Sequence, residues 1–226
     1  LQTLADAIKL LLKEQILPSK ADRAMYLLAP LIALVPSFLI FMIIPLGPDI
    51  TFEWQNSLYT IPLVGADLNV GVLYFLALSS IAVYSVVLAG WSSGSKYPLL
   101  GGVRASAQMI SYEAAMGLAL VPIILYSGSL SLVDIVNSQS GNLSTSIPIL
   151  NSIVSFIPKW NIFPQFVAFG IFFIAAVAEV NRAPFDLVEA EQELVGGFHT
   201  EYSGFRFAMF FLAEYINMFN MCAITA

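Results

Sequence analysis

Long apolar runs alternate with short polar segments along most of the chain. Five of these runs approach or exceed the roughly 20 mostly apolar residues that an α-helix needs to cross the hydrocarbon core of a bilayer. The predicted membrane-spanning helices cover residues 25–46, 71–91, 105–127, 163–182 and 205–226. The pattern predicts an all-α fold, a polytopic membrane helix bundle in which residues 1–226 form a single membrane domain.

A different pattern occupies residues 1–17. Apolar residues recur there at helical spacing and share one face: Leu1, Leu4, Ala5, Ile8, Leu11, Leu12 and Ile16. The charged residues Asp6, Lys9 and Lys13 lie on another face. This arrangement is typical of an amphipathic helix that lies in the plane of the membrane interface, and we expect the segment to do so here.

Composition supports a membrane protein and narrows its chemistry. Of the 226 residues, 58% are hydrophobic and 11% are charged, which is outside the range of soluble globular domains. The single cysteine, Cys222, provides neither an intrachain disulfide nor a thiolate cluster, and one histidine offers no metal-ligand set. The phosphate-binding spacing G-x-x-x-x-G-K-[ST] is also absent. We therefore expect no redox centre, metal, nucleotide or nucleic acid to be bound by this chain.

Basic residues are distributed unevenly among the connections between the predicted helices. Eight of the nine fall in or beside the N-terminal segment, the 92–104 connection and the 183–204 connection, whereas the other two connections contain only Lys159. Because Lys and Arg concentrate on the cytoplasmic side of membrane proteins, these three segments are predicted to face the cytoplasm or its equivalent. We expect a bacterial or archaeal plasma membrane, with an organelle inner or thylakoid membrane as the alternative.

Three glutamates fall within the predicted spans: Glu113, Glu179 and Glu214. An ionised carboxylate at the centre of a membrane helix costs about 2.5–3.5 kcal/mol, so each of them needs a partner or a function. Under a structural interpretation they are neutral or paired, as Glu179 would be with Arg182, and hold helices together. Under a functional interpretation they face a wet cavity and relay protons.

Glu113 is set apart from the other polar residues of its own helix. Arg104, Gln108 and Ser111 share one face at helical spacing, and Glu113 points nearly the opposite way. Its partner is therefore expected on another helix, where the other two intramembrane glutamates are the candidates.

The connection after the fourth predicted span is acidic. Asp186 and Glu189 have the spacing of a capping box for a short helix of about 187–195, closed by Gly196-Gly197. Glu191 would project from the apolar face of that helix. A solvated loop and a buried loop are both compatible with this acidity, and the aromatic residues around it favour burial. His199 can titrate near neutrality or serve as a packing residue.

Three blocks of the sequence resemble the membrane subunit of respiratory complex I called NuoH in bacteria, which has mitochondrial and chloroplast counterparts. The blocks are ADAIKLLLKEQILPSKAD (5–22), KYPLLGGVRASAQMISYEAAMG (96–117) and EVNRAPFDLVEAEQELVGGFHTEYSGFRFAMFFLAEYINM (179–218). The third block is long and specific, and the agreement is weakest in the 47–70 and 128–162 connections. That family has eight spanning helices, so the resemblance implies that this chain contains the second to the sixth.

The resemblance also implies a function. The family's subunit forms the floor of the quinone chamber of a proton-pumping NADH:quinone oxidoreductase and begins a chain of buried carboxylates that leads into the membrane arm. It implies that Glu113, Glu179 and Glu214 line this proton path. The residues that it places in or beside the loop between chamber and path are Asp186, Glu189, Glu191, Glu193, His199, Glu201, Arg182 and Arg104.

Partners and cofactors follow from the same resemblance. Quinone is the implied substrate, and FMN, NAD and iron–sulfur clusters are expected on partner subunits rather than on this chain. The implied partners are the peripheral quinone-site subunits, the antiporter-like membrane subunits and the lipid bilayer.

Other functions stay open at this point. A homologous membrane subunit of a ferredoxin- or F420-linked dehydrogenase, or of an energy-converting hydrogenase, shares the PFDL and EAE blocks. A secondary transporter would also use midplane carboxylates, but it predicts inverted repeats, and we find none. A purely structural anchor predicts that neutralising the buried glutamates is harmless.

Overall fold

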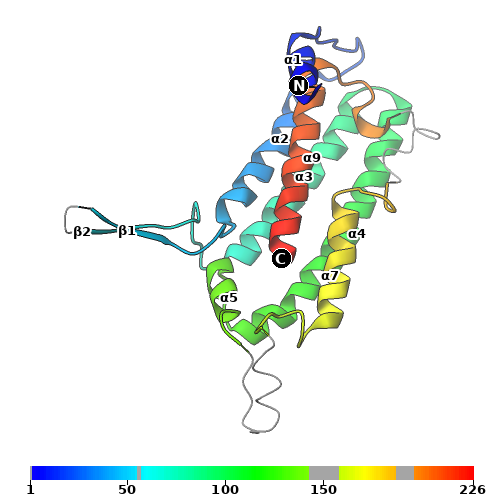
Figure 1. Ribbon diagram of the computed structural model, residues 1–226. Coiled ribbons are helices and arrows are strands. Elements are labelled where there is room, and N and C mark those ends of the chain that lie inside the picture. The colour runs from blue at the N-terminus through cyan, green and yellow to red at the C-terminus, as the bar shows by residue number, and fades with distance from the viewer. Residues whose placement is uncertain (1, 55–56, 143–157, 187–195) are drawn as a thin grey trace.

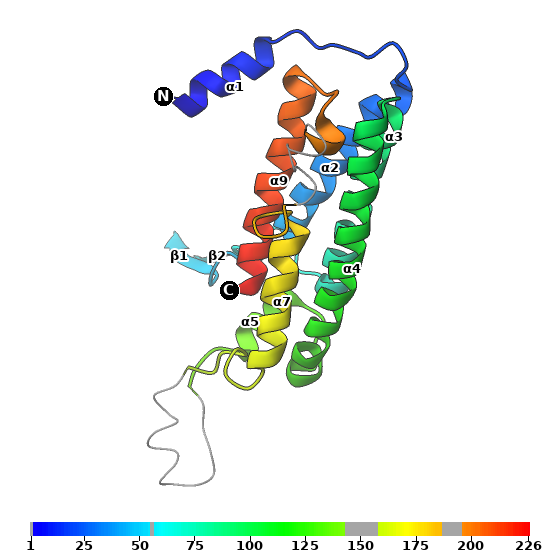
Figure 2. The same cartoon turned by 90° about the vertical axis from the view of Figure 1, so that its right-hand side faces the viewer.

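The computed structural model describes residues 2–54, 57–142, 158–186 and 196–226. The helices are α1 (Gln2–Leu12), α2 (Arg23–Ile43), α3 (Gly71–Ser92), α4 (Lys96–Ser127), α5 (Leu132–Ser138), α7 (Phe166–Glu179) and α9 (Gly204–Thr225), with a 3-10 turn η1 (Gly197–His199). Two strands, β1 (Ile50–Trp54) and β2 (Ser57–Ile61), complete the described elements. Helices α2, α3, α4, α7 and α9 form a bundle, and α1 lies across one end of it (Figures 1 and 2).

The predicted membrane helix bundle is confirmed. Within the described residues, α2, α3, α4 and α9 are long and apolar enough to cross a membrane. Helix α4 has 32 residues and begins at Lys96, well before the predicted start at residue 105. Pro98 does not prevent this early start because it lies in the first helical turn, where backbone N–H groups have no partner within the helix.

The fourth predicted span, 163–182, is longer than the helix that forms. Helix α7 has 14 residues and falls short of a full membrane crossing. On its N-terminal side, the Gln165 side chain donates to the carbonyl oxygen of Pro122 at 3.0 Å. On its C-terminal side, Asn181 adopts a left-handed backbone with φ 49°, a conformation that ends a helix and that asparagine tolerates better than most residues.

The opening segment is helical over α1 and has no regular secondary structure over residues 13–17, so the helix is shorter than the predicted 1–17. Its side chains Ile8, Leu11 and Leu12 are exposed, as an interfacial helix that faces lipid requires. The backbone N–H of Ile16 donates to the Ser203 hydroxyl at 2.9 Å, which ties this segment to the start of α9.

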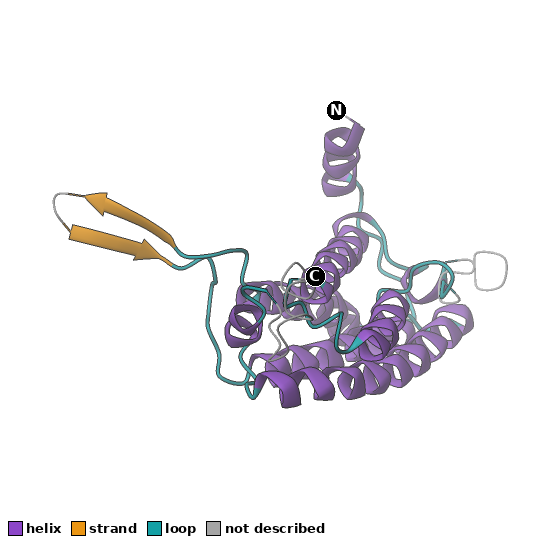
Figure 3. Cartoon of the chain, turned by 60° about the horizontal axis from the view of Figure 1, so that its bottom comes forward, coloured by secondary structure: helices purple, strands orange, loops and turns teal. Residues whose placement is uncertain are grey.

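A β-hairpin occupies the 47–70 connection, which the sequence pattern had shown only as a connection. Strands β1 and β2 pair in antiparallel register, with Phe52 opposite Tyr59 and their rings stacked at 5.7 Å. Their alternating β-branched and aromatic residues suit a strand pair, but each run is too short to stand out beside the membrane helices. The hairpin stands away from the helical body (Figure 3).

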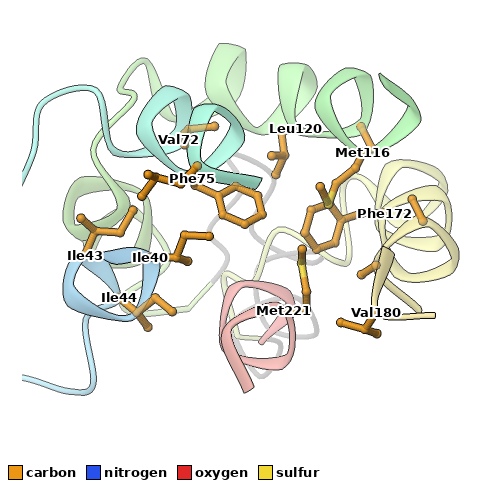
Figure 4. Packing of buried hydrophobic residues seen from close by; sticks show 14 of the residues in the cluster. Ile40, Ile43, Ile44, Val72, Phe75, Met116, Leu120, Phe172, Val180 and Met221 are labelled. Atoms are coloured by element: carbon orange, nitrogen blue, oxygen red, sulfur yellow. The ribbon is translucent and has the colours of Figure 1, made fainter. Parts of the chain in front are cut away.

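Two clusters of buried apolar side chains hold the bundle together. The one nearer the hairpin joins all five bundle helices, and Figure 4 shows its packing. Its labelled members are Ile40, Ile43, Ile44, Val72, Phe75, Met116, Leu120, Phe172, Val180 and Met221. The second cluster lies toward α1 and includes Tyr26, Phe198 and Phe210, so it fastens the segment before α9 to the bundle.

The close contact between α3 and α4 depends on glycine. A Cβ atom at Gly90 of α3 would lie 2.5 Å from the Pro98 carbonyl oxygen and 3.2 Å from the Gly102 Cα on α4. Small residues let membrane helices approach this closely. The distance between α3 and α4 is therefore set by the backbone contact at Gly90 and Gly102.

We predict that Gly90→Ala destabilises the bundle by about 1–3 kcal/mol, because the added methyl group meets backbone atoms that cannot move independently. Gly170→Ala on α7 is the matched control, since a Cβ atom there meets nothing within 4 Å. Unfolding of both variants by SDS titration in mixed micelles measures the effect. Equal midpoints for the two variants would contradict it.

Candidate functional site

A cavity of about 80 Å³ lies inside the bundle, beside η1 and the C-terminal end of α7. It has room for several water molecules. Its polar lining residues are Ser37, Ser85, Glu179, Asn181, His199, Glu214 and Asn217. Two of the three intramembrane glutamates and the only histidine of the sequence therefore line one cavity.

Glu179 is the most deeply buried acidic residue of this site. It is the last residue of α7, and its side chain is 2% exposed. Its Oε2 atom has no hydrogen-bond partner among the described residues. A buried carboxyl oxygen without a partner is costly, so water in the adjoining cavity is the natural group to satisfy it. Glu113 is its electrostatic neighbour.

Glu113 lies on α4 and is held from α3. Its Oε1 atom accepts a hydrogen bond from the Ser79 hydroxyl at 2.9 Å and another from the Ser80 hydroxyl. The expected partner on another helix therefore exists, but a serine pair rather than a glutamate provides the hydrogen bonds. The other two intramembrane glutamates were the predicted candidates, and of these Glu179 interacts with Glu113 through its charge.

Glu214 forms an ion pair across the bundle. Its Oε1 atom lies 3.2 Å from a guanidinium nitrogen of Arg182, and that guanidinium also lies over the Tyr215 ring at 5.3 Å. The structural interpretation had paired Arg182 with Glu179, three residues earlier in the sequence. Helical spacing does not apply there, because α7 ends at Glu179 and the backbone turns at Asn181.

His199 is packed among aromatic rings. It is 9% exposed, and its ring makes edge contacts with Phe198, Phe207 and Phe211 at 5.0, 5.4 and 5.8 Å. Burial lowers the pKa of His199 to about 4, because the charged imidazolium would lose its hydration. The imidazole is therefore neutral near pH 7, which favours the packing interpretation over titration near neutrality.

Comparison with known proteins identifies the family. A family model described as NADH dehydrogenase matches residues 1–226. An H subunit of NADH-quinone oxidoreductase from Geobacter metallireducens is 52% identical over 236 aligned positions, which cover 100% of this chain and 62% of the relative. The chain belongs to the NuoH family. The corresponding H subunit of Brevibacillus brevis is 49% identical, with 99% of this chain and 58% of the relative covered.

The chain thus spans about 60% of the length of these relatives. An H subunit of NADH-quinone oxidoreductase from Geobacter sulfurreducens is 51% identical, and the alignment covers 100% of this chain and 62% of the relative. Membership of the NuoH family and the four long apolar helices together make this an integral membrane protein.

The described end of the acidic connection is buried against the bundle of this NuoH family member. A Cβ atom at Gly101 of α4 would lie 2.8 Å from the Gly197 Cα, so the backbone of η1 rests directly on α4. Tyr26 and Tyr202 stack with ring centroids 4.1 Å apart, and the Tyr26 hydroxyl donates to the Glu201 carbonyl oxygen at 2.7 Å. Residues 197–202 are therefore fixed to α2 and α4.

The remaining predicted residues are only partly placed. Asp186 is exposed and is an electrostatic neighbour of Glu214. Arg104 is exposed on α4, and Glu201 is half-buried. The predicted helix over 187–195, with Glu189, Glu191 and Glu193, lies outside the described residues.

Three candidate functional residues, Ser79, Ser80 and Gln108, were not predicted from the sequence. Ser79 and Ser80 contact Glu113, and their signal is a pair of hydroxyls inside an apolar span. Gln108 stood out only as part of a polar face. Its Nε2 atom lies within hydrogen-bond distance of the carbonyl oxygens of Ala178 and Phe185, at 3.1 and 2.9 Å, and of the Asn181 side-chain oxygen at 3.2 Å. It thus fastens the turn after α7 to α4.

The depressed pKa of His199 predicts a pH effect on stability. Between about pH 4 and pH 6.5 the unfolded chain binds a proton at His199 that the folded chain does not bind. Stability from this group is therefore present above about pH 6.5 and is lost as the pH falls toward 4, by up to about 3 kcal/mol.

Unfolding free energies of the wild type and His199→Gln in detergent, measured across this pH range, test the effect. The carboxylates titrate in both proteins, so only the difference between the two curves reports on His199. We expect the wild type to lose more stability on acidification than the variant. Parallel curves would contradict the assignment.

Proposed function

We propose that this chain is the membrane subunit of a proton-pumping NADH:quinone oxidoreductase that forms the floor of the quinone chamber and begins the proton path. The observation that carries the proposal is the cavity that Glu179 and Glu214 share, with Glu113 as an electrostatic neighbour of Glu179. The relatives are named as subunits of NADH-quinone oxidoreductase, which favours the quinone enzyme over ferredoxin- or F420-linked relatives.

The proposed path runs from Glu214 through the cavity to Glu179 and on to Glu113. Glu214 is the entry because its side chain is 22% exposed and is paired with Arg182, whereas that of Glu179 is 2% exposed. Carboxylates are the usual groups of proton relays inside membranes. Water in the cavity would bridge the carboxyl groups of Glu214 and Glu179, which both line it.

The 186–201 segment would couple quinone chemistry to this path. Its described end, Phe198 and His199, lines the same cavity as Glu179 and Glu214. Quinone reduction on the far side of the segment would change charge or hydration there, and the carboxyl groups would change protonation in response. Two like charges about 4 Å apart interact by about 4 kcal/mol at an effective dielectric constant of about 20, which is enough to move a proton.

The proposal assigns the electron carriers to other subunits. FMN, NAD and iron–sulfur clusters would be bound by partner subunits, and quinone would be the substrate in the chamber. The peripheral quinone-site subunits would cover the end of the bundle that carries α1 and η1, and the antiporter-like subunits would continue the proton path. Neither nucleic acid nor a metal ion is assigned to this chain.

The arrangement of the connections supports one sidedness. Helix α1, the start of α4 and η1 lie at the same end of the bundle, and the hairpin and α5 lie toward the other (Figure 1). The basic residues concentrate at the first of these ends. We assign that end to the cytoplasm of a bacterial or archaeal cell, or to the equivalent side of an organelle membrane.

Neutralising one carboxylate of the path and one of the coupling segment tests the proposal. Glu179→Gln and Glu191→Gln, each in the assembled complex in inverted membrane vesicles, are expected to lower NADH-driven proton pumping at least about tenfold. Glu179→Gln removes a titratable proton from the path, and Glu191→Gln removes a charge from the segment that would couple quinone chemistry to it. Quinone reductase activity and acidification of the vesicle lumen are the two measurements.

Glu53→Gln on the exposed strand β1 is the control, because its carboxylate lies on the hairpin, away from the bundle interior. It is expected to retain both activities. Wild-type quinone reduction and pumping in both Glu179→Gln and Glu191→Gln would defeat the proposal.

A further inference from the structure

Two consecutive serines interrupt the apolar face that α3 turns toward α4. Ser79 is 2% exposed, and Ser80 is partly buried. The Ser79 hydroxyl lies 2.9 Å from Oε1 of Glu113 and 2.9 Å from the carbonyl oxygen of Leu76. The Ser80 hydroxyl is hydrogen-bonded to the same Oε1 atom and lies 3.0 Å from the same carbonyl oxygen. Each hydroxyl therefore has two acceptors within reach.

A serine hydroxyl has one hydrogen, so it donates to one of these acceptors at a time. When Glu113 is a carboxylate, it can only accept, and both hydroxyls can donate to it. When Glu113 is protonated on Oε1, its own O–H becomes a donor. A serine hydroxyl that has turned its hydrogen to the Leu76 carbonyl, the usual back-bonded position in a helix, can then accept it.

This exchange removes a penalty that a proton relay inside a membrane would otherwise meet. A carboxyl group that gains or loses a proton next to fixed partners leaves a donor or an acceptor unpaired, and an unpaired polar group is costly in a low dielectric. The serine pair offers a satisfied hydrogen-bond arrangement for each state of Glu113. Glu179, on the neighbouring helix α7, interacts electrostatically with Glu113.

We propose that Ser79 and Ser80 are positioning residues that act as a hydrogen-bond switch, allowing Glu113 to take up and release a proton within the bundle. The inference rests on the proposed function, in which Glu113 follows Glu179 in the path. In the step, one O–H bond breaks at the carboxyl group of Glu179 and one forms at Oε1 of Glu113. Glu179 is left as the carboxylate, and no electron is transferred.

The test compares hydroxyl-free and hydroxyl-bearing variants in the assembled complex in membrane vesicles. Ser79→Ala/Ser80→Ala is expected to slow proton pumping about tenfold, the effect of losing a hydrogen bond to a charged group. Ser79→Ala/Ser80→Thr restores one hydroxyl and is expected to regain most of the rate. Ser106→Ala is the matched control, because its buried hydroxyl bonds to the Val103 carbonyl at 3.0 Å in the same back-bonded manner.

A spectroscopic measurement separates positioning from a general structural defect. The carboxyl C=O stretch of Glu113 is identified in infrared difference spectra of the working complex by its loss in Glu113→Gln. In Ser79→Ala/Ser80→Ala this band is expected to move to higher wavenumber, since it loses its hydrogen bonds. A variant that only lowers the amount of complex weakens the band without moving it. If the double variant does not assemble, each single alanine variant is measured in the same way and is expected to show a smaller shift.

Two outcomes overturn the inference and can be told apart. If Glu113→Gln stops pumping while the alanine variants keep the wild-type rate and an unmoved band, the switch is wrong and the proposed function stands. If Glu113→Gln and Glu179→Gln both pump at the wild-type rate, the proton path itself is wrong, and the switch falls with it.

Discussion

The cost of holding a carboxyl group inside a membrane helix bundle is the constraint on which the rest of this structure depends. Glu179 is almost fully buried, Glu113 is half-buried, and Glu113 interacts with Glu179 through its charge. Three features of the fold lower that cost. The cavity beside Glu179 can hold water, a serine pair bonds Glu113, and Arg182 pairs with Glu214.

Local backbone features place these groups where the remedies can act. The early end of α7 puts Glu179 at a helix terminus beside the cavity, rather than at the middle of a regular helix. Gln108 fastens the following turn to α4, and Gly101 lets η1 rest on the same helix. The segment that would report quinone chemistry is thus joined at its described ends to the helix that carries Glu113.

Apolar periodicity was sufficient to predict the bundle and the amphipathic opening segment, and the aromatic residues of the segment before α9 favoured the burial seen at its described end. Apolar periodicity also marked the three intramembrane glutamates, because a charge in an apolar run needs no tertiary information to be recognised. The hairpin, the early end of α7 and the Glu214–Arg182 pair could not be predicted. Helical spacing shows which face a residue occupies, whereas its partner depends on which neighbouring helix presents a group at the same depth.

The central claim is that Glu113 and Glu179 act as one proton-relaying unit. A double-mutant cycle on the assembled complex tests it most directly, with proton pumping measured for Glu113→Gln, Glu179→Gln and the variant that carries both. If the two residues work in series, the second substitution causes little further loss of pumping rate. The doubly substituted complex should then pump about as slowly as the slower single variant. Losses that multiply, as they do for independent sites, would contradict the account.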